Sequence, residues 1–227
     1  MPRLSSVLLA AAALAAVPAS AEQRRFPLTG FDRVVVAGSD DVTITRGGFA
    51  VTADGAAADL DRLDIAVVDG VLKISRKRGD WRSWNGKAVR VAVALPALRG
   101  LSLSGSADVQ ADRGDADRFA LTLSGSGDVS LAKLDAKTAD ISLSGSGDVV
   151  TGGRCGAVNL RLSGSGNADL SALKCTNASI SVAGSGDVRA HVAGAATVQV
   201  AGSGDVAIAG GARCTKRVAG SGTVTCS

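Results

Sequence analysis

Apolar and polar residues alternate in short stretches along most of the chain, and each stretch ends at a glycine. LSLSGSADV, LTLSGSGDV and ISLSGSGDV, which begin at residues 101, 121 and 141, show the pattern most clearly. Apolar residues stand four and two places before each glycine, except that Lys216 breaks the last pair. Alternation with a period of two predicts β-strands with one buried face. The glycines, at intervals of 18 to 20 residues, are Gly105, Gly125, Gly145, Gly164, Gly184, Gly202 and Gly220.

Another apolar column stands four residues after these glycines, so the chain turns and then resumes a strand. Gly-Ser-Gly supplies the positive φ angles and close backbone approach of a sharp corner, and the following aspartate can accept hydrogen bonds from backbone amides. Coils with corners in register stack their strands in parallel about 4.8 Å apart. The sequence therefore predicts an all-β fold, a single-stranded parallel β-helix (solenoid) with Gly-Ser-Gly-Asp corners. The usual chirality of parallel crossovers predicts that it is right-handed.

Differences in coil length must be absorbed between the corners. The variable stretches AKLDAKTAD, TGGRCGAV and SALKCTNAS lie midway between them. We expect these stretches to be loops.

Residues 22–100 depart from the repeat, although GSDDV at Gly38 has the form of a first corner. AAADLDRL predicts a short helix, DIAVVDGVLKIS predicts two strands with a tight turn at Asp69-Gly70, and AVRVAVAL predicts a strand that Pro96 ends. We interpret this region as the irregular start of the solenoid, which caps an otherwise open edge. The predicted organisation is a signal peptide at 1–21, a cap and first coils at 22–100, and regular repeats at 101–227.

The first residues, MPRLSSVLLAAAALAAVPASA, have the features of a secretory signal, with Arg3, an apolar run and the small residues Ala19-Ser20-Ala21. The apolar run is too short to span a membrane, and no later segment approaches the ~20 apolar residues of a spanning helix. The chain is therefore expected to be exported and to be periplasmic, cell-surface or secreted, without a membrane span.

Composition narrows the choice of partners. Glycine is abundant, with 29 residues, and the formal net charge is +4. Acidic and basic residues are interspersed, so we expect no nucleic-acid partner. Four cysteines in an exported chain favour disulfides, and a single histidine leaves little for a Cys/His zinc site.

The register of the repeat predicts which cysteines pair. Cys155 and Cys175 each lie nine residues before the next corner glycine, so they should occupy equivalent positions of neighbouring coils. Their Cα atoms should then lie within the ~4.4 to 6.8 Å that a disulfide accepts. The remaining pair, Cys214 and Cys226, would tie down the last coil.

The combination of FDRVVVAGSDDVTITRG, LDRLDIAVVDGVLKIS, VRVAVALPALRGLSLSGSADV and repeated LSGSGDV resembles the bacterial family of auto-transporter adhesin head domains, or GIN domains. The resemblance covers essentially the whole chain after residue 21. It implies an exported right-handed β-helix with an adhesin-like role, and it brings no catalytic residues with it.

The corner aspartates raise the question of a metal site. They are Asp108, Asp128, Asp148, Asp187 and Asp205. Asn167 and Thr223 interrupt the column, and the nine-residue calcium-binding repeat of other β-solenoids is absent. We favour corner capping by hydrogen bonds, with a cation site as the alternative, and we expect no metal, cofactor or catalytic residue. The lone His191 is expected to be an ordinary position on a coil.

The stretch RKRGDWRSWNGK is not explained by the repeat. It contains two tryptophans among basic residues, and these are Arg76, Lys77, Arg78, Trp81, Arg82, Trp84 and Lys87. The tryptophans could cover the end of the core. Alternatively, Trp81, Trp84, Arg76, Arg78, Arg82 and Lys87 form a ligand-binding platform that stacks a sugar ring or holds an anionic envelope polymer.

Three functions therefore remain open. The favoured one is an exported structural or adhesin-like envelope module without catalysis, whose partner is an envelope or extracellular polysaccharide or another surface protein. The second is a glycan or anionic-polymer binder that uses the Trp81/Trp84 loop. The third is a polysaccharide-active β-helix enzyme, which would need clustered charges on one face, whereas the repeats show only the isolated departures Arg161, Arg189 and Asp169.

Overall fold

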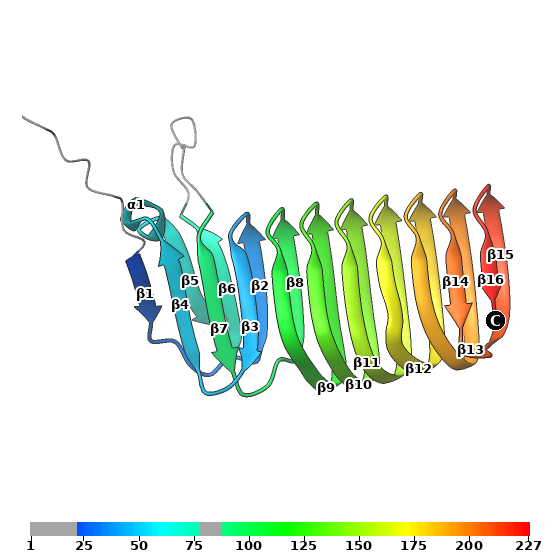
Figure 1. Ribbon diagram of the computed structural model, residues 1–227, viewed down its shortest axis with the longest axis horizontal. Coiled ribbons are helices and arrows are strands. Elements are labelled where there is room, and N and C mark those ends of the chain that lie inside the picture. The colour runs from blue at the N-terminus through cyan, green and yellow to red at the C-terminus, as the bar shows by residue number, and fades with distance from the viewer. Residues whose placement is uncertain (1–21, 78–87) are drawn as a thin grey trace, which may run out of the picture.

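The protein is an elongated β-solenoid (Figure 1). The structure is a computed structural model that describes residues 22–77 and 88–227. The expected signal peptide lies outside these residues. Within the described residues, no helix is long and apolar enough to cross a membrane.

The regular part consists of strands that stack in parallel, coil upon coil. Each long strand leaves a sharp corner, runs along one face, curves round and returns along the other face to the next corner (Figure 1). Gly145 pairs with Gly125 on one side and Gly164 on the other, so the corners are in register, as predicted. The strands are β8 (Gly100–Gly105), β9 (Val109–Gly125), β10 (Val129–Gly145), β11 (Val149–Gly164), β12 (Ala168–Gly184), β13 (Val188–Gly202), β14 (Val206–Ala209), β15 (Arg213–Gly220) and β16 (Val224–Cys226).

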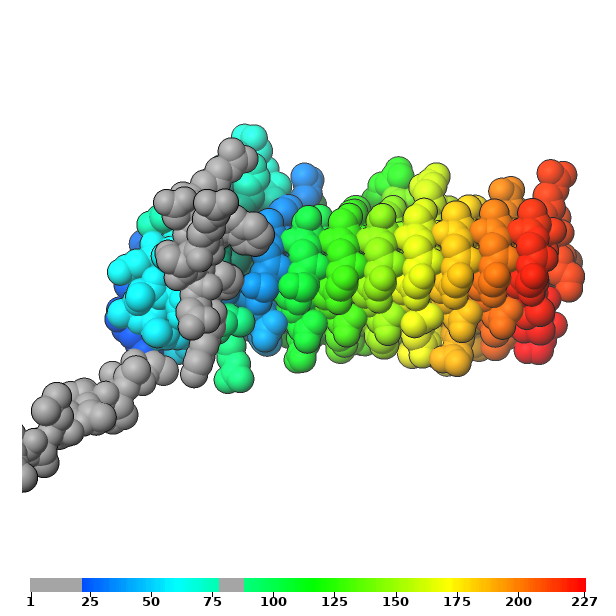
Figure 2. Space-filling view, turned by 90° about the horizontal axis from the view of Figure 1, so that it is seen from above, coloured from blue at the N-terminus to red at the C-terminus, as the bar shows by residue number. Residues whose placement is uncertain are grey.

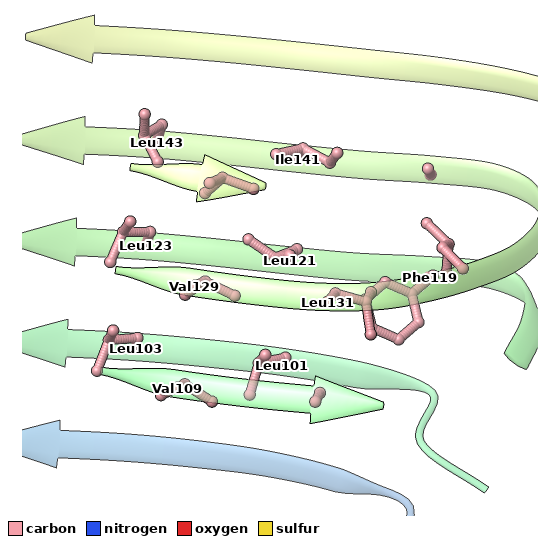
Figure 3. Close-up of a cluster of buried hydrophobic side chains, with 14 of the residues drawn as sticks. Leu101, Leu103, Val109, Phe119, Leu121, Leu123, Val129, Leu131, Ile141 and Leu143 are labelled. Carbon is pink, nitrogen blue, oxygen red and sulfur yellow. The ribbon is translucent and has the colours of Figure 1, made fainter. Parts of the chain in front are cut away.

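The core lies between the two faces and is lined by the apolar columns of the repeat. Leu123 and Leu143 are at most 3% exposed, and they point inward together with Val129 of the opposite face (Figure 3). Phe119 fills the wider space inside the bend. The predicted alternation is therefore confirmed, because the inward members are the buried ones.

The expectation of loops midway between corners is wrong. The stretch AKLDAKTAD lies inside β10, and its backbone stays paired with both neighbouring coils. The differences in length are absorbed by shifts of register, for example between Leu131 and Leu134 and between Val150 and Gly153. A bulge accommodates an extra residue while most of the ladder is kept, so the bend does not need a loop.

Both glycines of a corner permit close stacking, and a Cβ at Gly125 would lie only 2.1 Å from the carbonyl oxygen of Gly105. Gly125 has a φ of 132°, as the corner was predicted to require. Gly127 is needed for closeness, because a Cβ there would lie 2.0 Å from the carbonyl oxygen of Ala107 in the preceding coil. Ser126 and Gly127 both donate their backbone N–H to the oxygen of Gly105. Each corner thus rests directly on the backbone of the one before it.

The N-terminal cap contains the expected helix, α1 (Ala57–Leu60), and the expected tight turn. Asp69 and Gly70 both have positive φ angles, and they join two antiparallel strands. The cap strands are β1 (Glu22–Phe26), β2 (Arg33–Gly38), β3 (Asp41–Arg46), β4 (Ala50–Gly55), β5 (Leu63–Val68), β6 (Val71–Arg76) and β7 (Arg90–Leu95).

The order of the layers in the cap differs from their order in the sequence. On one face β2 lies between β6 and β8, and on the other β3 lies between β7 and β9. The first coil of the sequence is therefore an inner layer, and β6 and β7 lie outside it. Antiparallel pairs extend the cap further, with β5 on β6, β4 on β7 and β1 on β4.

Two disulfides pair the cysteines as predicted. Cys155 and Cys175 join neighbouring coils, with Cα atoms 4.5 Å apart. Cys214 and Cys226 join β15 to β16 across the last coil. Lys216 stands there in the inward column, and its Nζ donates to the carbonyl oxygen of Val224 at 3.1 Å. The disulfide and the lysine together close the C-terminal end of the core.

Candidate functional site

The predicted ligand-binding residues lie mostly outside the described part of the chain. They are Arg78, Trp81, Arg82, Trp84 and Lys87, which fall between β6 and β7. The described residues on either side, Arg76 and Val89, lie beside the corner of the neighbouring coil formed by β2 and β3.

Arg76 forms a buried ion pair with Asp40 at this corner. The Nε of Arg76 donates to Oδ2 of Asp40 at 2.7 Å, and its Nη2 donates to Oδ1. Asp40 is only 3% exposed. A carboxylate of α1 also contributes, because Oδ1 of Asp59 lies 3.9 Å from Nη1 of Arg76. The hydrogen bonds to Asp40 raise the pKa of Arg76. Arg76, one of the predicted ligand-binding residues, thus binds acidic side chains of the protein itself.

Asp40 holds both ends of the segment 78–87. Its Oδ1 also accepts a hydrogen bond from the backbone N–H of Val89, at 2.8 Å. One buried carboxylate therefore contacts the residue just before β7 and the last residue of β6. Arg76 is half-buried, Val89 is buried and both are hydrogen-bonded to Asp40, so the described residues on either side of 78–87 are held in place.

The sequence contains a signal that sets Asp40 apart from the other corner residues. In the corner GSDDV, Asp40 stands where later corners have Ala107 or Gly127. This position is buried in the repeat. A carboxylate at a buried position requires a partner, and an arginine is a favourable one. The identity of the partner depends on the layer order of the cap, which the sequence does not reveal.

The corner aspartates form a ladder of hydrogen bonds along one edge of the solenoid, which faces the viewer in Figure 2. Oδ1 of Asp128 accepts from the backbone N–H of Asp148 at 2.8 Å, and Oδ1 of Asp148 accepts from that of Asn167 at 2.7 Å. The ladder begins at Asp41 and runs to Thr223. Corner capping is therefore confirmed, and the amide that each side chain caps belongs to the next coil.

Metal binding gains no support from this edge. Among the described residues, no group of three or more His, Cys, Asp or Glu side chains is placed to hold a metal ion. Asn167 takes the place of aspartate in the ladder and accepts from the N–H of Asp187 at 3.0 Å. A neutral amide thus makes the same bond as a carboxylate.

A depression of about 430 Å³ lies on the outer side of the bend. Its charged side chains are already paired. Arg154 bonds Asp135 at 2.5 Å, and Lys137 lies 3.1 Å from Asp117. The hydrogen bond from Arg154 lowers the pKa of Asp135. A carboxylate with a lowered pKa stays ionised at neutral pH and cannot donate a proton there.

His191, the lone histidine, is half-buried within β13, beside Lys174 of the preceding coil and Ala209 of the next. The three departures from the repeat lie on both faces. Arg161 stands on the returning half of β11, whereas Asp169 and Arg189 lie just beyond their corners on β12 and β13.

The family described as "Putative auto-transporter adhesin, head GIN domain" matches residues 30–212. The chain belongs to this family. The GIN-domain match covers most of the cap and of the regular coils, including the three departures Arg161, Asp169 and Arg189. Among curated proteins, none matches the chain.

Solved structures share the GIN-domain solenoid at low sequence identity. A putative adhesin from Bacteroides fragilis NCTC 9343 is 20% identical with a TM-score of 0.82, over 92% of this chain and 97% of that one. A putative adhesin from Parabacteroides distasonis ATCC 8503 is 19% identical with a TM-score of 0.74, over 92% and 98%. A putative lipid binding protein from the same strain is 18% identical with a TM-score of 0.72, also over 92% and 98%. At these identities the likeness concerns the fold.

Proposed function

We propose that the protein is an exported, non-catalytic, adhesin-like module that binds a polysaccharide or a protein at the cell envelope or surface. Membership of the GIN-domain family supports the adhesin-like role. Two disulfides support export, because such bonds persist in oxidising compartments. The leader-like residues 1–21 support the same conclusion.

The observation that carries the non-catalytic assignment is the state of one carboxylate in each of two surface depressions, Asp135 and Asp169. Glycoside hydrolysis needs a carboxylic acid with a raised pKa beside a second carboxylate. Asp135 instead has a lowered pKa because Arg154 hydrogen-bonds it, and Asp169 has a lowered pKa because Ser171 does. Ionised, hydrogen-bonded carboxylates are suited to accepting hydrogen bonds from a ligand rather than to protonating a leaving group.

A second candidate function is glycan or anionic-polymer binding by the loop that carries Trp81 and Trp84. The double anchor on Asp40 favours it, since it fixes both ends of the segment. In this proposal Arg76 positions the loop, and Arg78, Arg82 and Lys87 supply charge for the ligand. Because the residues on either side of the loop are already held in place, less conformational entropy of the loop is lost when a ligand binds.

A binding screen on the mature chain, residues 22–227, tests both candidates. The probes are immobilised envelope polysaccharides, whole envelope fractions and phospholipid vesicles, and reducing-sugar release is followed in parallel. We expect retention on a polysaccharide or envelope fraction without sugar release. Sugar release would overturn the non-catalytic assignment, and the absence of retention on every probe would overturn the adhesin-like role.

Two variants of the loop separate the candidates. Trp81→Ala combined with Trp84→Ala should abolish retention if the loop is the binding site, whereas Ser83→Ala in the same loop is the control. If the double variant binds as strongly as the unchanged protein, the loop is excluded and binding must occur elsewhere on the solenoid.

A further inference from the structure

Two of the departures from the repeat, Asp169 and Arg189, stand side by side with Val150 on one face of the solenoid. Val150 of β11 pairs with Asp169 of β12, and Asp169 pairs with Arg189 of β13. The three residues follow their corners at the same distance, so they form one outward column over three coils. In this column the preceding coil carries Ser130, and the following coil carries Ala207. Asp169 and Arg189 are thus neighbours and not isolated substitutions.

This trio, Val150, Asp169 and Arg189, lines a depression of about 330 Å³. The volume is at the lower end of the range for small-molecule sites, ~300 to 1,000 Å³. Corner residues form its upper rim, namely Asp148, Asn167 and Asp187. The short side chains of Ser130 and Ala207 flank the trio, so an extended ligand can continue past both ends of the depression.

Asp169 is held in place through one carboxylate oxygen, which leaves its other oxygen and the guanidinium of Arg189 available to a ligand. Oδ1 of Asp169 accepts hydrogen bonds from the backbone N–H and the hydroxyl of Ser171, at 3.0 and 2.5 Å. These bonds lower the pKa of Asp169 and set its orientation. Among the described residues, Oδ2 of Asp169 and the guanidinium of Arg189 have no hydrogen-bond or ion-pair partner. An oriented acceptor therefore lies beside a planar set of donors.

Val150 adds an apolar surface to this polar pair. Its side chain is 50% exposed, an unusual state for a valine in a fold whose other valines mostly line the core. An apolar side chain next to an acceptor and a donor matches the two kinds of surface on a pyranose ring. The ring presents C–H groups on one side and hydroxyls at its rim.

The charges around the depression select against other small ligands. A cation would be repelled by Arg189, and the rim residues Asp148, Asn167 and Asp187 already use Oδ1 to accept bonds from the next coil. An anion would be repelled by Asp148, Asp169 and Asp187. A neutral, polyhydroxylated ligand uses both the carboxylate and the guanidinium without either penalty.

We propose that Val150, Asp169 and Arg189 form a binding site for one neutral sugar unit of a polysaccharide. The ionised carboxylate accepts from a hydroxyl, the guanidinium donates to the adjacent one, and the ring packs on Val150. The open ends of the depression fit an internal unit of a chain. The site lies on β11 to β13 of the regular coils, apart in sequence from residues 78–87; it rests on the polysaccharide binding proposed above and assigns that binding to a place.

Affinity gel electrophoresis of the mature chain tests the proposal. The probes are four soluble polysaccharides, namely dextran, laminarin and galactomannan, which are neutral, and polygalacturonate, which is acidic. Arg189→Ala and Asp169→Ser introduce residue types that the same column already carries at Ala207 and Ser130. The control is Arg161→Ser, which removes an exposed arginine from the other face and matches its neighbours Ser142 and Ser181.

We expect at least one neutral polysaccharide to retard the protein, with Arg189→Ala and Asp169→Ser each weakening binding at least tenfold and Arg161→Ser leaving it unchanged. Retardation by polygalacturonate alone, or by none of the four polymers, would overturn the site. So would equal weakening by Arg161→Ser. Circular dichroism of each variant shows whether the solenoid is intact.

The same assay separates this site from the loop. Loss of binding in Trp81→Ala/Trp84→Ala, with Arg189→Ala and Asp169→Ser unaffected, would support the loop and refute the trio. Loss in the trio variants alone supports the site proposed here and refutes the loop. Loss in both sets would support a polymer that contacts both places.

Discussion

Cys155 lies directly beside Cys175 of the next coil, and a disulfide joins them with a Cα–Cα distance of 4.5 Å. This contact spans 20 residues of sequence. It depends on the two coils being stacked without a slip, because a shift by one residue would turn one side chain outward. The bond therefore records the register of the whole array.

Removing this disulfide should destabilise the solenoid measurably. Closing a loop of this length restricts the unfolded chain by about 3 kcal/mol. Cys155→Ala with Cys175→Ala should therefore lower the free energy of unfolding by about that amount in urea denaturation. Non-reducing peptide mapping checks the pairing itself, and a Cys155–Cys214 or Cys175–Cys226 crosslink would contradict the register.

Adjacent positions of β10 should respond oppositely to a charge. Leu143 is 3% exposed and faces the core, whereas Ser142 faces outward. Leu143→Asp should lower the free energy of unfolding by several kcal/mol, because it buries a carboxylate without a partner. Ser142→Asp should change it by less than about 0.5 kcal/mol. Equal effects in urea titrations would refute the alternation of inward and outward residues.

The hydrogen-bond ladder at the corners makes a prediction for Asp128. Asp128→Ala removes the acceptor of the Asp148 N–H and should lower the free energy of unfolding by about 1 kcal/mol. Asp128→Asn should have little effect, since Asn167 accepts the equivalent bond elsewhere in the ladder. Thermal unfolding at low salt measures both variants. Calcium chloride should leave their melting temperatures unchanged, and a rise of several degrees with calcium would favour a cation site instead.

Replacing Asp40, which pairs with Arg76, should lower the free energy of unfolding much more than replacing the adjacent Asp41. Asp40→Ala leaves the largely buried Arg76 without its main partner, which costs about 3 to 5 kcal/mol. Asp41→Ala at the same corner removes only one ladder bond and should cost about 1 kcal/mol. Urea denaturation compares the two. Similar losses would mean that the Asp40–Arg76 pair contributes no more than an ordinary corner contact.

Lys216 should keep the C-terminal edge from associating. It stands in a column that is otherwise apolar, on a strand that pairs with β13 only. A charged side chain on an open edge opposes the docking of another strand. Lys216→Leu should therefore produce concentration-dependent oligomers in size-exclusion chromatography with light scattering. Lys216→Arg keeps the charge and should remain like the unchanged protein, and oligomers of this variant would exclude charge as the reason.

The regular coils could be predicted well from the sequence, because nearly every coil has apolar residues and glycines at the same positions. The apolar pairs, the glycines and the positions of Cys155 and Cys175 all constrain one register. The bends could not be predicted as strands, since their residues follow no common pattern. Asp169 and Arg189 of the proposed sugar site stand out in the sequence as charged residues within the repeats, but their pairing follows only from the exact register of neighbouring coils.

The cap was predicted element by element but not as an arrangement. The helix at Ala57–Leu60 and the turn at Asp69-Gly70 follow from local signals. The choice of neighbours for β2 and β3 depends on contacts between segments far apart in the sequence, and the alternation of β2 is equally compatible with other neighbours. The pairing of Asp40 with Arg76 depends on this choice, so it could not be predicted either.

The inner position of β2 and β3 has a consequence for how the chain folds from its N-terminal side. These strands come early in the sequence, but their partners are β6 and β8 for β2, and β7 and β9 for β3, which all come later. The strands from β2 to β9 must therefore assemble as one cooperative block, because long stretches of chain have to be closed before their contacts form. Each later coil pairs with the coil before it, so the coils can fold one after another onto the structure already formed. The cap is thus the template for growth, and the number of coils can change at the other end without disturbing it.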